Sequence, residues 1–198
     1  MDYKHLVVNV KENALRFENK NALYVKNETL NTWEGISWKN MYHRVENLAK
    51  GLLQFGVETQ HNVAIFAENM PNWIIADLAI MSIRAVTVPI YATSSTKEVE
   101  YVINDAEVSL LFVGNQHEYD QAYELLESSS YLKLIVALTD IIKLKSSVSS
   151  MYLEDFVAAS PTQEIENIYL KRQQDLDVKD LASIIYTSGT TGEPKGVM

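Results

Sequence analysis

Between residues 61 and 138, short apolar segments alternate with longer segments whose apolar residues recur at helical spacing. Short runs of Val, Ile and Leu are typical of buried strands. Parallel neighbours in a sheet need a long crossover, and the segments between these runs are long enough to be helical crossovers. The alternation therefore predicts an α/β fold, with parallel-sheet layers flanked by helices. The expected strands are residues 61–67, 86–90, 108–113 and 134–138, and the expected helices are residues 71–85, a segment capped by Ser95, and residues 116–126.

Residues that favour helix ends support these boundaries. Ser37 is a good N-cap, and Gly56 is placed to end the helix that follows it. Pro71 suits the first turn of the next helix, while Ser95 and Glu98 form a capping-box pattern. The helix from Pro71 is apolar almost all round, so we expect it to be deeply buried. The helix after Ser37 is expected to cover one face of the sheet with Met41, Val45, Leu48, Ala49 and Leu52.

The segments on either side of this alternation are less regular. Residues 21–26 and 31–38 are expected to form a hairpin around a polar turn. Beyond the alternation, the pattern loosens into a Ser-rich stretch, followed by a short helix near residues 152–158. The charged segment 163–180 is interpreted as a surface linker, and it leads into a last, buried strand at residues 182–186.

No segment of the sequence is expected to enter a membrane. Residues 1–18 alternate polar and apolar residues without the continuous apolar run of a secretory signal. The longest apolar stretch, residues 73–90, is interrupted by Asp77, Arg84 and Pro89, so we predict no membrane span. Peripheral contact with a membrane surface is compatible with both observations.

Charge and cysteine content exclude several classes of function. The 198 residues include 26 acidic and 17 basic residues, for a net charge of −9, and contain no Lys/Arg cluster that would attract nucleic acid. The chain has no cysteine, which excludes disulfides, thiolate metal sites and a cysteine nucleophile. Together with the missing secretory signal, this favours a reducing compartment. We predict a cytoplasmic protein without a nucleic-acid partner.

Outside the end of the chain, the polar residues give no catalytic or metal site. The four histidines lie far apart in the sequence, so we interpret them as surface or structural residues. Asp105 with Glu107, and Glu154 with Asp155, are interpreted as solvated charges rather than as acid/base pairs. We assign neither a catalytic residue nor a metal ligand within the 198 residues.

A glycine- and hydroxyl-rich loop, YTSGTTGEPKGV, occupies residues 186–197, directly after the last expected strand. Its glycines allow tight turns that bring backbone N–H groups close to an anion, and its Ser and Thr hydroxyls add further donors. Lys195 adds a mobile positive charge, so the residue types suit a triphosphate. The loop is not a Walker motif, because that spacing would require a glycine at Pro194 and a Ser or Thr at Gly196.

The loop resembles the signature of the adenylate-forming superfamily, which includes acyl-CoA synthetases, luciferases and peptide-synthetase adenylation domains. The superfamily pattern Tyr-Thr-Ser-Gly-Thr-Thr-Gly-x-Pro-Lys-Gly is matched completely. Residues 32–34, 68–73 and 86–95 are similar to successive blocks of the long-chain fatty acyl-CoA synthetase branch. One departure is Arg84, which stands at the expected helix end where relatives usually carry a glycine.

The resemblance implies an ATP-dependent acid–thiol ligase that forms a fatty acyl-adenylate and then acyl-CoA. In this family a carboxylate attacks the α-phosphate of ATP, pyrophosphate leaves, and coenzyme A then displaces AMP. The implied substrates are a fatty acid, ATP and coenzyme A, with Mg²⁺ as cofactor. The residues implied to hold the ATP phosphates are Thr187, Ser188, Gly189, Thr190, Thr191, Gly192, Lys195 and Gly196. The alternatives are adenylation of another carboxylic acid, of the peptide-synthetase, aryl or short-chain type, and a non-catalytic nucleotide-binding module.

The resemblance also implies how the chain relates to a whole enzyme. Residues 1–198 correspond to the N-terminal portion of the AMP-binding domain, with the phosphate-binding loop 186–197 at its end, and the C-terminal lid domain is absent. The missing part of the same chain is an expected partner, because the adenine pocket, acyl tunnel and mobile lysine of the family lie downstream. We expect the isolated 198 residues to be inactive and their last loop to be poorly held.

Overall fold

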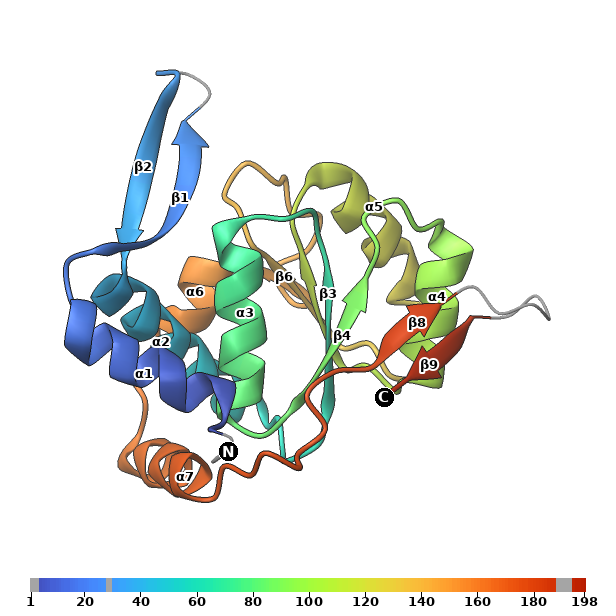
Figure 1. The fold of residues 1–198 in the computed structure, drawn as a ribbon. Helices are drawn as coiled ribbons and strands as arrows, with labels where there is room; N and C mark the ends of the chain where they lie inside the picture. The colour runs from blue at the N-terminus through green and yellow to red at the C-terminus, as the bar shows by residue number, and fades with distance from the viewer. Residues whose placement is uncertain (1–3, 28–29, 188–193) are drawn as a thin grey trace.

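The chain is built around a five-stranded sheet in the order β4-β3-β5-β6-β7, with helices against both faces (Figure 1). The computed structural model describes residues 4–27, 30–187 and 194–198. Neighbouring strands of this sheet all run parallel, which confirms the predicted α/β class. The strands are β3 (Asn62–Phe66), β4 (Val86–Ile90), β5 (Leu110–Val113), β6 (Leu134–Ala137) and β7 (Ser150–Tyr152).

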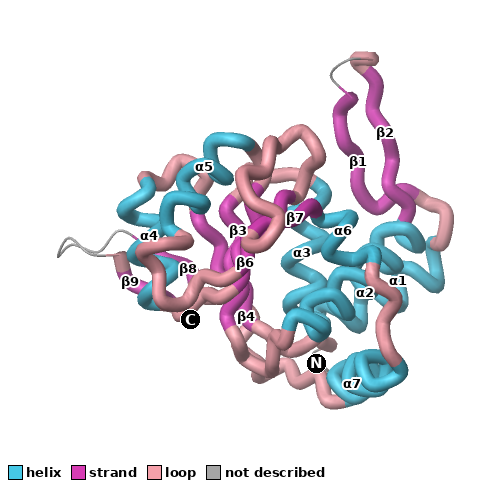
Figure 2. The backbone as a smooth tube through the Cα atoms, turned by 180° about the vertical axis from the view of Figure 1, so that it is seen from behind, coloured by secondary structure: helices cyan, strands magenta, loops and turns pink. Residues whose placement is uncertain are grey.

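Side chains alternate across the sheet and form two layers of core, as the period of two in a strand requires. Leu110 and Phe112 of β5 belong to one layer, whereas Leu111 and Val113 belong to the other. The rear view in Figure 2 also shows two groups of helices separated by the sheet. Helices α1 (Leu6–Phe17), α2 (Trp38–Phe55) and α3 (Pro71–Ser82) cover the first layer, and α4 (Thr96–Asp105) and α5 (Gln116–Leu125) cover the second.

The predicted capping residues do begin and end the helices. The Ser37 hydroxyl accepts a hydrogen bond from a backbone N–H in the first turn of α2 at 3.2 Å, and Gly56 ends that helix with a φ of 94°. This φ lies in the left-handed region that glycine adopts without strain. Ser95 and Glu98 form the predicted capping box at the start of α4. In the described parts of the chain, no helix is both long enough and apolar enough to cross a membrane.

The first helix, α1, lies in a segment for which the sequence predicted none. It buries Val7, Val10 and Ala14, which follow one another at spacings of three and four residues. This spacing places the three side chains on one face, and Val7 and Val10 of this face belong to the core beneath α2 and α3. Because the apolar face of α1 is narrow, the sequence of this segment shows an alternation of polar and apolar residues rather than a clear helical pattern.

The interpretation of residues 163–180 as a surface linker is wrong for its first part, which forms α7 (Gln163–Gln174). Tyr169 is only 3% exposed and belongs to the core that α2 covers. Next to it, Nζ of Lys50 on α2 lies 2.8 Å from the Glu166 carboxylate and 5.3 Å from the centre of the Tyr169 ring. A buried ring, an ion pair and a hydrogen bond from Gln173 to the Ser82 carbonyl at 2.6 Å therefore hold the helix, although its composition is polar.

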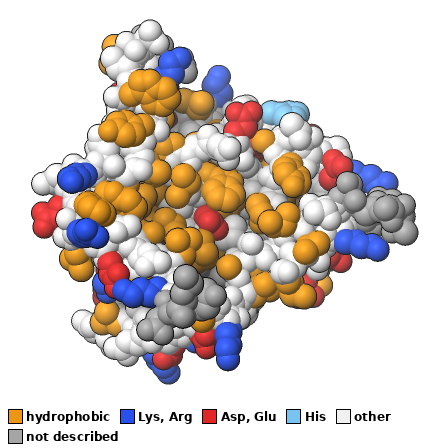
Figure 3. All heavy atoms as spheres, viewed as in Figure 1, with side chains coloured by type: hydrophobic (Ala, Val, Ile, Leu, Met, Phe, Trp, Pro, Cys, Tyr) orange, Lys and Arg blue, Asp and Glu red, His pale blue; other side chains and the backbone are white. Residues whose placement is uncertain are grey.

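The structure confirms the predicted hairpin, which consists of β1 (Asn21–Asn27) and β2 (Thr32–Ser37) and projects from the body of the molecule (Figure 1). Tyr24 and Trp33 on it are 59% and 67% exposed. Figure 3 shows hydrophobic side chains on this hairpin and on the adjoining part of the body. After β6 the predicted short helix is present as α6 (Leu153–Ala158), but the sequence did not predict β7 within the Ser-rich stretch.

Helix α3 ends at Ser82 rather than at residue 85. Two residues later, Arg84 adopts a φ of 63°, in the left-handed region where a non-glycine side chain is strained. The resemblance predicts a glycine at this position, and a glycine would take this φ without strain. The Arg84 guanidinium instead forms an ion pair with Asp180, at 2.7 Å.

Candidate phosphate-binding hairpin

Just before the glycine-rich loop, residues 182–184 lie beside β4, which is an edge strand of the parallel sheet. The Thr87 N–H donates a hydrogen bond to the Ala182 carbonyl at 3.0 Å, and the Ile184 N–H donates to the Thr87 carbonyl at 3.0 Å. These bonds make a single parallel bridge between Thr87 and Ser183. They also occupy backbone groups that an edge strand otherwise leaves unpaired. The prediction of a buried strand at residues 182–186 is therefore wrong for its first half, which forms only this bridge.

Two short strands form the base of the loop, β8 (Ile185–Thr187) and β9 (Lys195–Val197), and they pair antiparallel. Thr187 lies opposite Lys195, at the end of the pair from which the loop leaves. Both side chains are exposed. A hydroxyl donor and an ammonium group are thus available at the base of the loop, and this combination suits an anion such as a phosphate group.

Gly196 lies opposite Tyr186 in the hairpin. A Cβ atom at Gly196 would lie 2.8 Å from Cγ2 of Ile184 and 3.2 Å from Cζ of Tyr186. Non-bonded carbon atoms pack at about 3.5 to 4.0 Å, so only a glycine fits over the Tyr186 ring without displacing these neighbours. Gly196 therefore has a packing role in the hairpin, while its contact with ATP stays a prediction.

Tyr186 joins the hairpin to the body of the molecule. It is 8% exposed, and its hydroxyl donates a hydrogen bond to Oδ2 of Asp105, at the end of α4, at 2.6 Å. Its ring meets the Tyr101 ring edge-on, at 6.4 Å between centroids. Burial, and next the Asp105 carboxylate, raise the pKa of the Tyr186 hydroxyl, which keeps it protonated and donating at neutral pH.

Asp105 is exposed, which agrees with its interpretation as a solvated charge, and its carboxylate also accepts the Tyr186 hydrogen bond. The two residues are 81 positions apart, and no sequence signal connects them. Three of the four histidines have hydrogen bonds in the structure that fit surface or structural roles, and Nε2 of His43 lies 3.3 Å from Nδ2 of Asn47 on the same helix, α2. His5 accepts a hydrogen bond from the N–H of Val7 at 3.3 Å, and His61 accepts one from the N–H of Glu58 at 3.2 Å.

Of the residues predicted to hold the ATP phosphates, the structure describes Thr187, Lys195 and Gly196. It brings these three together at the base of the loop. The other predicted phosphate ligands lie outside the described residues, and they are Ser188, Gly189, Thr190, Thr191 and Gly192. Their role stays a prediction.

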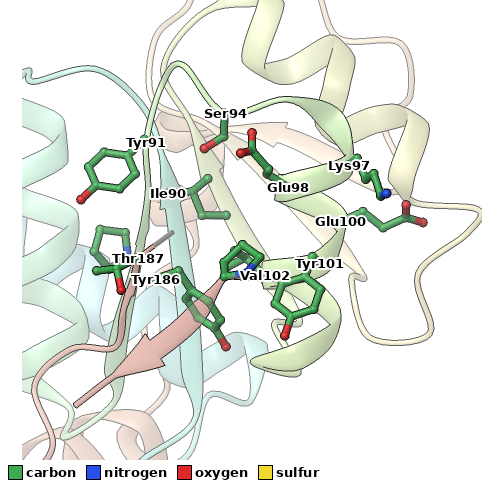
Figure 4. A pocket seen from close by; sticks show the side chains of 12 residues that line it. Ile90, Tyr91, Ser94, Lys97, Glu98, Glu100, Tyr101, Val102, Tyr186 and Thr187 are labelled. Carbon is green, nitrogen blue, oxygen red and sulfur yellow. The ribbon is translucent and has the colours of Figure 1, made fainter. Parts of the chain in front are cut away.

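A cavity of about 580 Å³ lies between β8 and α4, directly beside Thr187 (Figure 4). The rings of Tyr91, Tyr101 and Tyr186 line it, together with charged side chains from the start of α4. Its volume falls within the range of small-molecule sites. The base of the loop therefore opens onto a space large enough for an organic group attached to a phosphate.

Within residues 4–27, 30–187 and 194–198, no group of three or more His, Asp or Glu side chains is arranged to hold a metal ion. Mg²⁺ at nucleotide sites is bound through one or two carboxylates together with the phosphates of the substrate. The Mg²⁺ cofactor implied by the resemblance stays a prediction.

Comparison with known proteins shows which family this chain matches. Residues 10–198 match the family model described as AMP-binding enzyme. The long-chain-fatty-acid–CoA ligase ACSBG2 of Xenopus laevis is 30% identical over 170 residues, which cover 84% of this chain and 22% of that relative. The long-chain-fatty-acid–CoA ligase FadD15 of Mycobacterium bovis is 32% identical over 164 residues, which cover 83% of this chain and 26% of that relative. The chain thus spans about a quarter of the length of these curated relatives.

Solved structures share the fold at lower sequence identity. The anthranilate CoA ligase AuaEII, in complex with anthranoyl-AMP, superimposes with a TM-score of 0.78 at 20% identity, over 98% of this chain and 34% of that one. The coronafacic acid ligase from Pectobacterium brasiliense superimposes with a TM-score of 0.76 at 19% identity, over 96% of this chain and 34% of that one. The parallel sheet is therefore the architecture of these ligases. Because the family model covers residues 10–198, the chain belongs to the AMP-binding enzyme family.

Proposed function

We propose that this chain is part of an ATP-dependent acid–thiol ligase that converts a fatty acid to its acyl-adenylate and then to acyl-CoA. The observation that carries the proposal is the match of residues 10–198 to the AMP-binding enzyme family, with its signature loop on the β8–β9 hairpin. The names of the two curated relatives support a fatty acid as the acid substrate. Residues 1–198 would then be the N-terminal portion of the AMP-binding domain, and a C-terminal lid domain would lie in the rest of the protein.

In the proposed reaction, negative charge develops on pyrophosphate as the fatty acid carboxylate attacks the α-phosphate of ATP. Lys195 contributes a positive charge next to the departing phosphates, and Thr187 contributes a hydroxyl donor. When bound, Mg²⁺ neutralises part of the phosphate charge. The proposed phosphate-binding set is completed by Ser188, Gly189, Thr190, Thr191, Gly192 and Gly196.

In the second step of the proposed reaction, the thiolate of coenzyme A attacks the acyl carbonyl, the bond to the phosphate oxygen breaks, and AMP leaves. The cavity beside Thr187 is wide enough for an organic group next to the phosphates. We place this enzyme in the cytoplasm, where all three substrates occur, and the absence of cysteine supports that location. Peripheral contact with a membrane, the source of an apolar acid, is part of the same proposal.

The test is acid-dependent exchange between pyrophosphate and ATP in the whole protein that contains this chain. With a long-chain fatty acid we expect steady exchange. Lys195→Ala is expected to lower kcat by about 100-fold or more, because it removes a charge that stabilises the transition state. The matched control is Lys145→Ala, which removes another exposed lysine, one that pairs with Asp120 at 2.7 Å. The control should leave the exchange unchanged.

Other outcomes of the exchange experiment separate the competing functions. Exchange with aryl, amino or short-chain acids but not with fatty acids would favour adenylation of another acid. Binding of ATP without exchange for any acid would favour a non-catalytic nucleotide-binding module. Full exchange in Lys195→Ala would contradict the role proposed for the loop.

A further inference from the structure

A bidentate ion pair between Arg84 and Asp180 holds the chain just before the β8–β9 hairpin. Nε of Arg84 donates to Oδ2 of Asp180 at 2.7 Å, and Nη2 of Arg84 donates to Oδ1 at 2.8 Å. The two side chains are 23% and 13% exposed, so the pair is largely shielded from water. Two parallel hydrogen bonds between planar groups fix orientation as well as distance.

Arg84 holds this geometry from a strained backbone position. Its φ of 63° is one that glycine adopts easily and that a side chain disfavours. Strain of this kind persists only where the surrounding structure compensates for it. The compensation that the structure offers at Arg84 is the contact with Asp180, because the carbonyl contacts of Arg84 would be equally available to a glycine.

The contacts continue from Asp180 into the hairpin. The Arg84 carbonyl accepts hydrogen bonds from the backbone N–H of Gln60 at 2.7 Å and from its Nε2 at 3.1 Å. The same Gln60 side chain accepts a hydrogen bond from the N–H of Leu181 at 3.2 Å through Oε1. Beyond Leu181 come the two backbone bonds with Thr87 and then the bond between Tyr186 and Asp105. Arg84 and Gln60 therefore make the first of a series of hydrogen bonds that hold the chain from Asp180 to Tyr186, one residue before Thr187.

We propose that Arg84 is a positioning residue for the ATP-phosphate site. Arg84 does not line the cavity beside Thr187. By holding Asp180, it sets the register in which the chain runs along β4, and this register fixes where Thr187 and Lys195 stand relative to the sheet and to the cavity. This inference rests on the proposed function, since it is the ATP phosphates that the hairpin is taken to bind.

Arg84→Gly separates positioning from stability. A glycine removes the guanidinium and also relieves the strained φ, so the melting temperature should change little. The hairpin loses its first anchor, and a displacement of about 1 Å at a site can cost up to about 100-fold in rate. In the whole protein we expect KM for ATP to rise about tenfold in Arg84→Gly, while KM for the fatty acid stays within about twofold of the parent value.

Three further variants identify the ion pair as the cause. Asp180→Asn should raise KM for ATP to a similar extent, and the double variant should be no worse than either single one, because both remove the same interaction. Arg84→Lys keeps the charge but loses the bidentate geometry, and its KM for ATP should lie between those of the parent and Arg84→Gly. The control Asp120→Asn, on α5, removes the exposed ion pair with Lys145 and should leave both KM values unchanged.

Hydrogen exchange provides a readout that does not depend on turnover. In Arg84→Gly the amides of Leu181 and Ile184 should exchange at least about tenfold faster than in the parent, because their hydrogen bonds belong to the loosened series. The amide of Ile135, which donates to the Ser149 carbonyl inside the parallel sheet, should keep its rate.

The possible failures of this inference and of the proposed function are distinguishable. An active parent whose Arg84→Gly variant keeps its KM for ATP within about twofold contradicts the positioning role alone. Unchanged exchange at Leu181 and Ile184 contradicts it as well. A parent without acid-dependent pyrophosphate exchange contradicts the proposed function and, with it, the role of Arg84.

Discussion

At the scale of single residues, Tyr186 tests how firmly the hairpin is attached. Tyr186→Phe keeps the ring against Tyr101 but removes the hydrogen bond to Asp105. We expect the free energy of unfolding to fall by about 1 kcal/mol at neutral pH, as for a typical hydrogen bond whose acceptor can turn to water. Chemical denaturation of the parent and Tyr186→Phe measures the difference.

The same pair of proteins should show a pH dependence with a definite sign. The pKa of Tyr186 is raised in the folded state above its ordinary value of 10.0, first by burial and then by Asp105. A raised pKa means that the folded protein holds the proton more tightly, so the advantage of the parent over Tyr186→Phe is fully present below pH 10. It should shrink as the pH rises above that value. A difference that grows between pH 10 and 11 would contradict this assignment.

At the scale of elements, α7 shows how a polar helix can still be part of the core. Tyr169→Ala should lower the free energy of unfolding by about 3 kcal/mol, because it empties a buried aromatic site between α7 and α2. The neighbouring Leu170 is 55% exposed, and Leu170→Ala should cost less than about 0.5 kcal/mol. Urea denaturation of both variants measures these costs. Equal losses in the two variants would show that Tyr169 is not the anchor.

Elements with a strong local pattern were predictable, and those held by tertiary contacts were not. The four longer strands of the sheet are rich in Val, Ile, Leu and Phe, and their predicted positions agree with β3 to β6. β7 has three residues, beginning with Ser150, which is too short for a periodic signal. In α7 the helical pattern is weak because Tyr169 is its only fully buried residue. β7 and α7 form because contacts with neighbouring elements stabilise them.

The candidate site also has one part that was predictable from the sequence and one part that was not. The loop was predictable because its chemistry is written in consecutive residues, from Tyr186 to Gly196. The anchors of the loop were not, because Asp180 pairs with a residue 96 positions earlier and Tyr186 with one 81 positions earlier. The sequence did single out Arg84, as a departure from the family pattern. Only the structure gives that departure a partner.

At the scale of the whole molecule, the sheet order β4-β3-β5-β6-β7 places the reversal of strand order between β3 and β5. Gly114 follows β5 at this point. A Cβ atom there would lie 2.8 Å from Cβ of Ala67 and 2.8 Å from Cε of Met70, which both follow β3, and 3.1 Å from a carboxylate oxygen of Glu118 on α5. The loops after the two strands and the start of α5 thus converge on a space that only a glycine leaves open.

Gly114→Ala should therefore disturb the packing here, because Cβ of Ala67 cannot move without shifting the chain after β3. Oε2 of Glu118 is also held in place by the N–H groups of Gly114 and Asn115, at 2.8 and 2.9 Å. We expect the free energy of unfolding to fall by about 2 kcal/mol, as for other overpacked sites, with a lower urea midpoint and an unchanged slope. Gly56→Asn is the matched control, because no atom lies within 4 Å of a Cβ there, and asparagine tolerates its φ of 94° better than other side chains. The control should cost about 1 kcal/mol, which is the strain of a non-glycine residue in the left-handed region. If Gly114→Ala unfolds at the same urea concentration as the parent, the two loops are not packed as closely as the sheet order requires.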